Sequence, residues 1–161
     1  MGNEIIYYKT PIGTAKISGN NEGIQSIIFI DDDIKTSINI PDFLEPCLIQ
    51  LKEYFKGIRK DFSVKLNPGG TDFQNSVWNE LKKIPYSKTC SYMEQTKTLG
   101  NIKAIRAVAS ANGKNPISII IPCHRVIGSD GSLTGYAGGI WRKKWLLEHE
   151  NPSRQISLFK I

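Results

Sequence analysis

A cysteine followed directly by a histidine, Cys123-His124, is the pair of residues best suited to chemistry in this sequence. The apolar run Ile119–Ile121 predicts a buried strand, and Pro122 should end it because proline has no N–H to donate to a sheet. A thiol attacks strongly only after it loses its proton, and a free cysteine has a pKa of about 8.5. A base that takes up this proton would activate the sulfur. The segment therefore predicts a nucleophilic cysteine at the end of a buried element.

Two histidines could serve as that base, and two glutamates could support it. The chain contains two histidines, His124 and His149, and Glu148 and Glu150 flank the second. A carboxylate beside an imidazole fixes its tautomer and stabilises the imidazolium. Residue types alone do not choose between these pairs, and Cys123 could instead be a small buried apolar residue.

The cysteine spacing argues against a metal site. Cys47, Cys90 and Cys123 lie far apart, and with the histidines they lack the short paired spacings of a structural zinc site. The first residues lack the long apolar core of an export signal, and no apolar run is long enough to span a bilayer. We therefore expect a cytoplasmic protein with free thiols that needs no metal, no cofactor and no membrane.

The positive charge is confined to the second part of the chain. Residues 1–70 contain 8 Lys/Arg and 9 Asp/Glu, whereas residues 71–161 contain 13 and 6. A local basic excess is typical of nucleic-acid-binding domains, although many proteins that bind no nucleic acid are mildly basic.

Residues 1–66 predict a small α+β scaffold domain. Strand-like segments cover 5–10, 14–18 and 24–30, with turn residues between them. A helix should follow, because apolar residues recur at helical spacing from Leu48 to Phe55 before Gly57. This part contains no catalytic constellation, and residues 67–70 read as a linker.

Residues 71–161 predict a mostly helical domain. Thr71 with Gln74 and Ser91 with Glu94 match capping boxes, which open helices. Asn101 can cap a third helix, roughly 102–112. The two short helices joined at 99–101 predict a helix-turn-helix, a motif that also occurs in proteins that never touch DNA.

The segment Pro122–Val126 reads Pro-Cys-His-Arg-Val and resembles the signature of the O6-alkylguanine-DNA alkyltransferases. The resemblance covers nearly the whole chain and is strongest from about 71 to 150. Two departures are Ser87 and Ala109, which stand where glycine is usual. Further matching segments follow in the family's order: Phe73-Gln74, Val77-Trp78, Ile84-Pro85-Tyr86, Ser91-Tyr92, Arg106-Ala107-Val108, Ala111-Asn112-Gly113, Asn115-Pro116, Tyr136, Gly138-Gly139, Leu146-Leu147 and His149-Glu150.

The resemblance implies roles for individual residues. Cys123 would accept the alkyl group, His124 would act as its base through a bridging water, and Glu150 would orient His124. Tyr92 would donate a proton or hydrogen bond to the departing guanine, and Asn115 would tie the helix-turn-helix to the active-site segment.

The resemblance also implies a winged-helix-like C-terminal domain that binds alkylated double-stranded DNA in the minor groove as a monomer. Arg106 would enter the base stack in place of the flipped guanine. Residues implied to contact DNA or the flipped base are Ser91, Lys103, Ala104, Arg106, Ala107, Ala109, Arg125, Val126, Tyr136, Ala137 and Gly138.

Three other functions stay open at this point. A reader of alkylated DNA would form no adduct, a helix-turn-helix regulator would bind undamaged DNA with sequence specificity, and a cysteine hydrolase would turn over an ester or amide. Alkyl transfer to a thiol would give a stable thioether and hence a single turnover. The sequence leaves open whether O4-alkylthymine is also a substrate.

Overall fold

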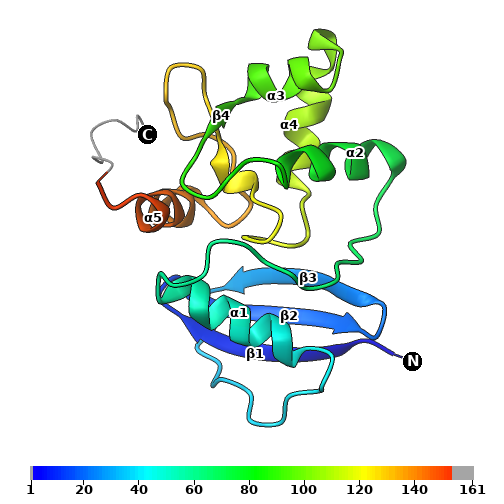
Figure 1. The fold of residues 1–161 in the computed structure, drawn as a ribbon, viewed down its shortest axis with the longest axis vertical. Coiled ribbons are helices and arrows are strands. Elements are labelled where there is room, and N and C mark those ends of the chain that lie inside the picture. Colours follow the sequence, from blue (N-terminus) through cyan, green and yellow to red (C-terminus); the bar gives the residue numbers. More distant parts are fainter. Residues whose placement is uncertain (1, 154–161) are drawn as a thin grey trace. The chain divides into compact units, whose positions relative to one another are not determined.

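The computed structural model of the chain describes residues 2–153, which form a mixed α/β fold (Figure 1). The fold divides into two compact units. One takes in the residues up to Gly69 together with Pro116–Ser118, and the other takes in Gly70–Asn115 and the residues from Ile119 onward. No helix in the described part is long and apolar enough to cross a membrane.

The first unit is an antiparallel three-stranded meander, β1 (Glu4–Thr10), β2 (Gly13–Asn20) and β3 (Gly23–Ile30). Strand side chains alternate between faces, so Ile6, Ile17 and Ile27 pair across the sheet and are buried together. Helix α1 (Glu45–Phe55) packs on this face, where the Phe55 ring contacts Tyr8 and Phe29 edge to face. The expected antiparallel sheet with one helix is thus observed.

The segment Pro116–Ser118 belongs to the first unit because it pairs with β3. The Ile27 N–H donates to the Pro116 carbonyl over 2.9 Å, and the Ser118 N–H donates to the Ile27 carbonyl over 3.1 Å. Ile117 and Ile27 form an isolated parallel bridge. The chain therefore returns to the first sheet shortly before Cys123, which the spacing of residues did not predict.

The described part of the second unit contains four α-helices: α2 (Asp72–Leu81), α3 (Tyr92–Thr98), α4 (Ile105–Gly113) and α5 (Ile140–Glu150). The two capping boxes are present, at Thr71 for α2 and at Ser91 for α3. The Asn101 side chain accepts from the Lys103 N–H, but the first turn there is a 3-10 helix, Ile102–Ala104, and α4 follows it. The expected third helix is thus present with a tighter start.

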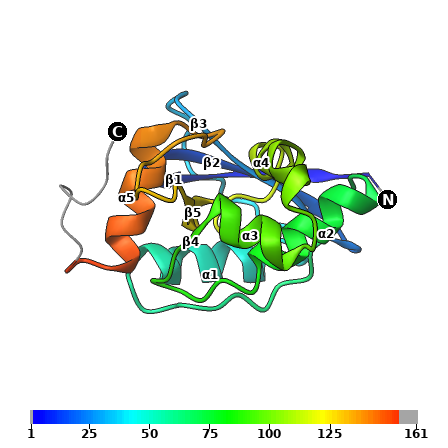
Figure 2. The same cartoon turned by 90° about the horizontal axis from the view of Figure 1, so that it is seen from above.

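A two-stranded parallel pair joins distant parts of this unit. Strand β4 (Cys90–Ser91) pairs with β5 (Val126–Ile127), and Figure 2 shows the pair between α5 and the group formed by α2, α3 and α4. Because β5 follows the 3-10 turn Cys123–Arg125, this pair fixes the residues just after the reactive segment relative to α3.

The predicted strand at Ile119–Ile121 is wrong. Ile119 and Ile121 are buried, but the segment is a turn, and only the preceding Ile117 makes a bridge to a strand. Ile119 has a φ of 74°, a left-handed conformation that cannot continue a strand. The apolar run reflects burial within the fold and not strand pairing.

Ser87 is the other non-glycine residue described with a positive φ, at 70°. This conformation costs a residue with a Cβ atom roughly 1–2 kcal/mol. The Ser87 N–H donates to Glu150 Oε1 over 3.3 Å, so the strained turn holds a donor against that carboxylate. Glycine would adopt this conformation without strain.

We expect Ser87→Gly to raise the free energy of unfolding by up to about 1 kcal/mol, because glycine adopts this φ without strain and keeps the backbone N–H. Urea denaturation of both proteins measures the difference. Lys88→Gly is the matched control, since its φ is negative and added chain freedom should lower stability. A Ser87→Gly variant that is less stable than the parent would contradict the strain.

Candidate active site

Cys123 is the first residue of a 3-10 turn and is half-buried. Its N–H donates to the Ile121 carbonyl over 2.8 Å. The Asn115 side-chain amide donates to the same carbonyl over 2.7 Å and to the Cys123 sulfur over 3.3 Å. One asparagine therefore fixes both the backbone before the thiol and the thiol itself.

His124 and Glu150 form a buried pair behind the thiol. His124 Nε2 lies 2.6 Å from Glu150 Oε2, and both side chains are almost fully buried. Of the two histidines and two glutamates that the sequence left open, these are the two in contact. His149 instead stacks on the Trp145 ring.

Arg125 closes the other side of the carboxylate. Its Nε donates to Glu150 Oε1 over 2.8 Å, its Nη2 donates to Oε2 over 3.1 Å, and its Nη1 donates to the Ile84 carbonyl over 2.7 Å. Burial alone raises the pKa of Glu150, but His124 and Arg125 outweigh it and hold the pKa well below its ordinary value. The carboxylate is ionised at neutral pH.

The ionised carboxylate decides the state of His124. Burial lowers the pKa of His124, and the attraction of Glu150 does not restore it, so the ring is neutral at pH 7. A carboxylate only accepts hydrogen bonds, so the ring hydrogen must lie on Nε2. Nδ1 is then the basic atom, and no described protein group hydrogen-bonds it.

Burial also raises the pKa of the Cys123 thiol, while the hydrogen bond from Asn115 and the charge of Lys143 lower it. Cys47 and Cys90 have no such support, and burial raises their pKa values to about 12 and about 11. Cys123 is therefore a thiol at rest, but it alone of the three has groups arranged to stabilise its thiolate.

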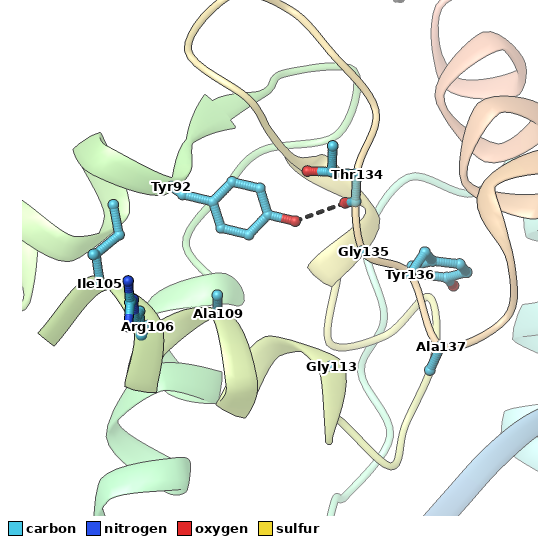
Figure 3. Close-up of a pocket in the computed structure, with 9 residues that line it drawn as sticks. All are labelled: Tyr92, Ile105, Arg106, Ala109, Gly113, Thr134, Gly135, Tyr136 and Ala137. Atoms are coloured by element: carbon cyan, nitrogen blue, oxygen red, sulfur yellow. Dashed lines mark hydrogen bonds between the residues drawn. The ribbon is translucent and has the colours of Figure 1, made fainter. Parts of the chain in front are cut away.

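A pocket of about 600 Å³ opens between α3, α4 and the loop before α5, a volume typical of small-molecule sites (Figure 3). The Tyr92 ring reaches from α3 toward that loop, where its hydroxyl donates to the Thr134 carbonyl over 2.8 Å. Burial raises the pKa of Tyr92, the hydrogen bond to Thr134 partly opposes this, and negative charge on Cys123 would add to the rise. The lining residues are Tyr92, Ile105, Arg106, Ala109, Gly113, Thr134, Gly135, Tyr136 and Ala137.

The structure separates the expected site residues into groups. Tyr92, Arg106, Ala109, Tyr136 and Ala137 line the pocket. The side chains of Lys103 and Ala107 are exposed on and before α4, and Ala104 is half-buried there.

Four others have structural contacts of their own. Ser91 caps α3, buried Val126 pairs with Cys90 in the small sheet, and the Gly138 carbonyl accepts from Arg142 Nη1 over 3.0 Å. Arg125 is committed to Glu150 and Ile84. Its side-chain nitrogens are engaged by these partners, and its contact with DNA or the flipped base stays a prediction.

Sequence reasoning missed Lys143. Its side chain is fully buried on α5, and Nζ donates to the Thr134 carbonyl over 2.8 Å. Lys143, Leu146, Leu147 and Glu150 are spaced by three, four and seven residues, which is the buried face of one helix. A lysine in that register was the available signal.

Models of two protein domains match this chain. Residues 5–68 match the ribonuclease-like domain of 6-O-methylguanine DNA methyltransferase, and residues 72–152 match its DNA binding domain. A methylated-DNA–protein-cysteine methyltransferase of Methanosarcina acetivorans is 48% identical over 150 residues, covering 89% of this chain and 95% of the relative. One of the same name from Mycobacterium tuberculosis is 43% identical over 153 residues, covering 91% and 93%.

Solved structures agree with these matches. The crystal structure of the Mycobacterium tuberculosis O6-methylguanine methyltransferase has a TM-score of 0.84 and 39% identity, and the match covers 96% of each chain. A structure of the Mycobacterium tuberculosis protein OGT in complex with DNA has a TM-score of 0.82 and 42% identity, covering 94% and 95%. The chain therefore belongs to the 6-O-methylguanine DNA methyltransferase family.

Proposed function

We propose that this protein repairs alkylated DNA by moving the alkyl group from O6 of a flipped guanine to its own Cys123. The observation that carries the proposal is the hydrogen bond from Asn115 to the Cys123 sulfur, with the His124–Glu150 pair at the adjacent residue. Tyr92 lines a pocket of nucleobase-compatible size. Every group in this site comes from one chain, so a monomer suffices.

DNA is bound by α3 and α4, acting as a helix-turn-helix in the minor groove. Small residues along one stretch, Ala104, Ala107 and Ala109, let the α4 backbone approach the groove, and Lys103 is exposed for a phosphate. Arg106 is exposed and also lines the pocket, so its side chain is suited to fill the space that the guanine leaves. Unstacking a base costs a few kcal/mol, and these contacts offset it.

The thiol loses its proton to His124. Nδ1 of the neutral ring takes it through one bridging water, and Glu150 stabilises the imidazolium that results. Arg125 acts through Glu150 as a positioning residue, because its two hydrogen bonds fix both carboxylate oxygens. The Asn115 amide hydrogen bond to sulfur favours the thiolate.

The thiolate then attacks the alkyl carbon in line, forming an S–C bond as the C–O6 bond breaks. The departing guanine takes a proton from the Tyr92 hydroxyl, and the backbone amide of Ala137 contacts O6. Backbone groups of Cys123 and Val126 read the guanine edge, and Tyr136 lines the pocket. Because a thioether has no carbonyl for water to attack, each chain reacts once.

Incubation with duplex DNA containing O6-methylguanine should add the mass of one methyl group to the protein, on the peptide that carries Cys123. Intact-mass and peptide mass spectrometry measure both. Cys123→Ser should gain nothing, and Cys90→Ser should react as the parent does. Repaired DNA in molar excess over protein would refute the single turnover, and an unmodified parent protein would favour a reader of alkylated DNA.

Stability should fall between pH 7.5 and 5.5 because of His124. An unfolded histidine gains a proton near pH 6.5, while the lowered pKa keeps the folded His124 neutral, so stability is lost as pH falls through 6.5. The loss is at most about 1.4 kcal/mol per pH unit. Thermal melts of His124→Gln should show a flatter pH dependence than the parent. His149→Gln is the control; an equal flattening in both would reject this assignment.

Arg106→Ala should slow methyl transfer from duplex DNA roughly tenfold, which corresponds to about 1.4 kcal/mol of lost support for the extrahelical base. Single-stranded DNA has no stack to refill, so the same substitution should slow its repair much less. Single-turnover rates on both substrates give the comparison, and Lys103→Ala controls for loss of charge. Equal slowing on the two substrates would show that Arg106 does not act in the base stack.

A further inference from the structure

Lys143 is a buried cation with no carboxylate partner among the described residues. Its ammonium donates to the Thr134 carbonyl over 2.8 Å and to the Tyr92 hydroxyl over 3.4 Å, and it lies 5.6 Å from the centre of the Tyr92 ring. Burying an ammonium without an ion pair is costly. This unfavourable burial of Lys143 lies close to the Cys123 thiol and the Tyr92 phenol, which indicates a functional reason for it.

The Tyr92 hydroxyl takes part in two hydrogen bonds, one as acceptor and one as donor. Lys143 Nζ donates to its oxygen, and the hydroxyl donates to Thr134. Rotation about the phenolic C–O bond can turn that hydrogen toward a base in the pocket, since the Tyr92 ring lines it. A phenol that gives its proton to a departing guanine becomes a phenolate. The Lys143 ammonium already contacts that oxygen, so it can stabilise the negative charge.

We propose that Lys143 acts through Tyr92 as a positioning residue and proton source, returning to the phenolate the proton that Tyr92 gives to the departing guanine. The inference rests on the proposed alkyl transfer and deepens it. Lys143 touches neither the alkyl carbon nor the guanine ring in this scheme; its partner is the Tyr92 oxygen.

The proton count closes without an outside reagent. The Cys123 proton passes to His124, the S–C bond forms, and the C–O6 bond breaks with its electron pair going to the guanine. The guanine takes the Tyr92 proton, and Lys143 supplies that proton to the phenolate. The site ends with a thioether, an imidazolium, a phenol and a neutral amine, so one positive charge is present before and after the reaction.

The acidities favour this direction. Burial lowers the pKa of Lys143 to about 8, an effect that the Cys123 thiolate partly opposes. Burial raises the pKa of Tyr92 above its ordinary value. Proton transfer from the ammonium to a phenolate is therefore downhill, and the ammonium is still mostly protonated at neutral pH.

The same contacts fit two other roles for Lys143, and each role predicts a different response to substitution. An anchor for the pocket loop through Thr134 needs only a hydrogen-bond donor, so arginine should replace it. A counter-charge for the Cys123 thiolate should affect every reaction of that thiol, whatever group leaves. A proton source needs a group that can lose a proton, which arginine cannot do in a protein.

The test uses the full chain and two free substrates, O6-benzylguanine and its 8-bromo derivative, whose purine leaves as a weaker base. Single-turnover rates of Cys123 benzylation are measured for the parent, Lys143→Met and Lys143→Arg. Lys144→Met, a change at the adjacent residue of α5, is the matched control. Iodoacetamide alkylation of Cys123 reports thiolate reactivity with no purine to protonate.

We expect Lys143→Met and Lys143→Arg each to slow benzyl transfer from O6-benzylguanine at least tenfold, and to slow the 8-bromo derivative clearly less. The rate of Cys123 alkylation by iodoacetamide should fall by a smaller factor than either benzyl-transfer rate. Lys144→Met should react at the parent's rate with all three reagents. Full activity in Lys143→Arg, or equal slowing of all three reagents in Lys143→Met, would overturn the proposal. A parent protein that forms neither the benzyl adduct nor the methyl adduct from O6-methylguanine DNA would instead refute the proposed function.

The parent protein supplies a measure that needs no folded variant. As pH rises through about 8, Lys143 loses its proton, so the rate advantage of the 8-bromo derivative over O6-benzylguanine should widen. A ratio that stays constant from pH 7 to pH 9 would overturn the proposal as well.

Discussion

The site depends on one shared carboxylate. Glu150 is bound on one side by His124 and on the other by Arg125, and the backbone N–H of Ser87 reaches it as well. Breaking a buried charge cluster by removing one partner is typically far more costly than removing a surface ion pair. The same contacts that stabilise the fold also fix the tautomer of His124, so stability and the proposed thiol activation depend on the same atoms.

Three distant segments meet at that carboxylate. The last residue of α5 carries it, and the turn at Ser87 and the 3-10 turn Cys123–Arg125 contribute its partners. Lys143 lies two helical turns before Glu150 on the same buried face and reaches the loop that lines the pocket. Helix α5 therefore contacts His124 and Arg125 through Glu150 and the pocket loop through Lys143.

Local patterns predicted much of this structure. Capping boxes at Thr71 and Ser91 are decided by side chains three residues apart, and the strands of the first sheet follow an alternation that only one buried face produces. The pair His124 and Glu150 came from resemblance, because the residues alone left His149 and Glu148 as equal candidates. Their separation by 26 positions carries no local signal.

What the sequence did not predict is set by tertiary contacts. Strands β4 and β5 have two residues each, too few for a periodic pattern. Ile119–Ile121 looked like a strand because burial alone explains an apolar run, and the φ of Ile119 depends on its surroundings. The buried contacts of Arg125 and Lys143 were not predicted, since a cation turns inward only when the fold supplies its acceptors.

The pairing of Ile117 with Ile27 bears on how this protein can be divided. Cutting after the linker near Gly69 would seem to release a self-sufficient reactive half, yet the strand partner of Ile117 would go with the discarded piece. The peptide between Asn115 and Ile119 would then lose the two backbone hydrogen bonds that hold it to β3. Such a fragment would keep every side chain around the sulfur. It would lose the backbone hydrogen bonds to Ile27 that position the main chain before Pro122.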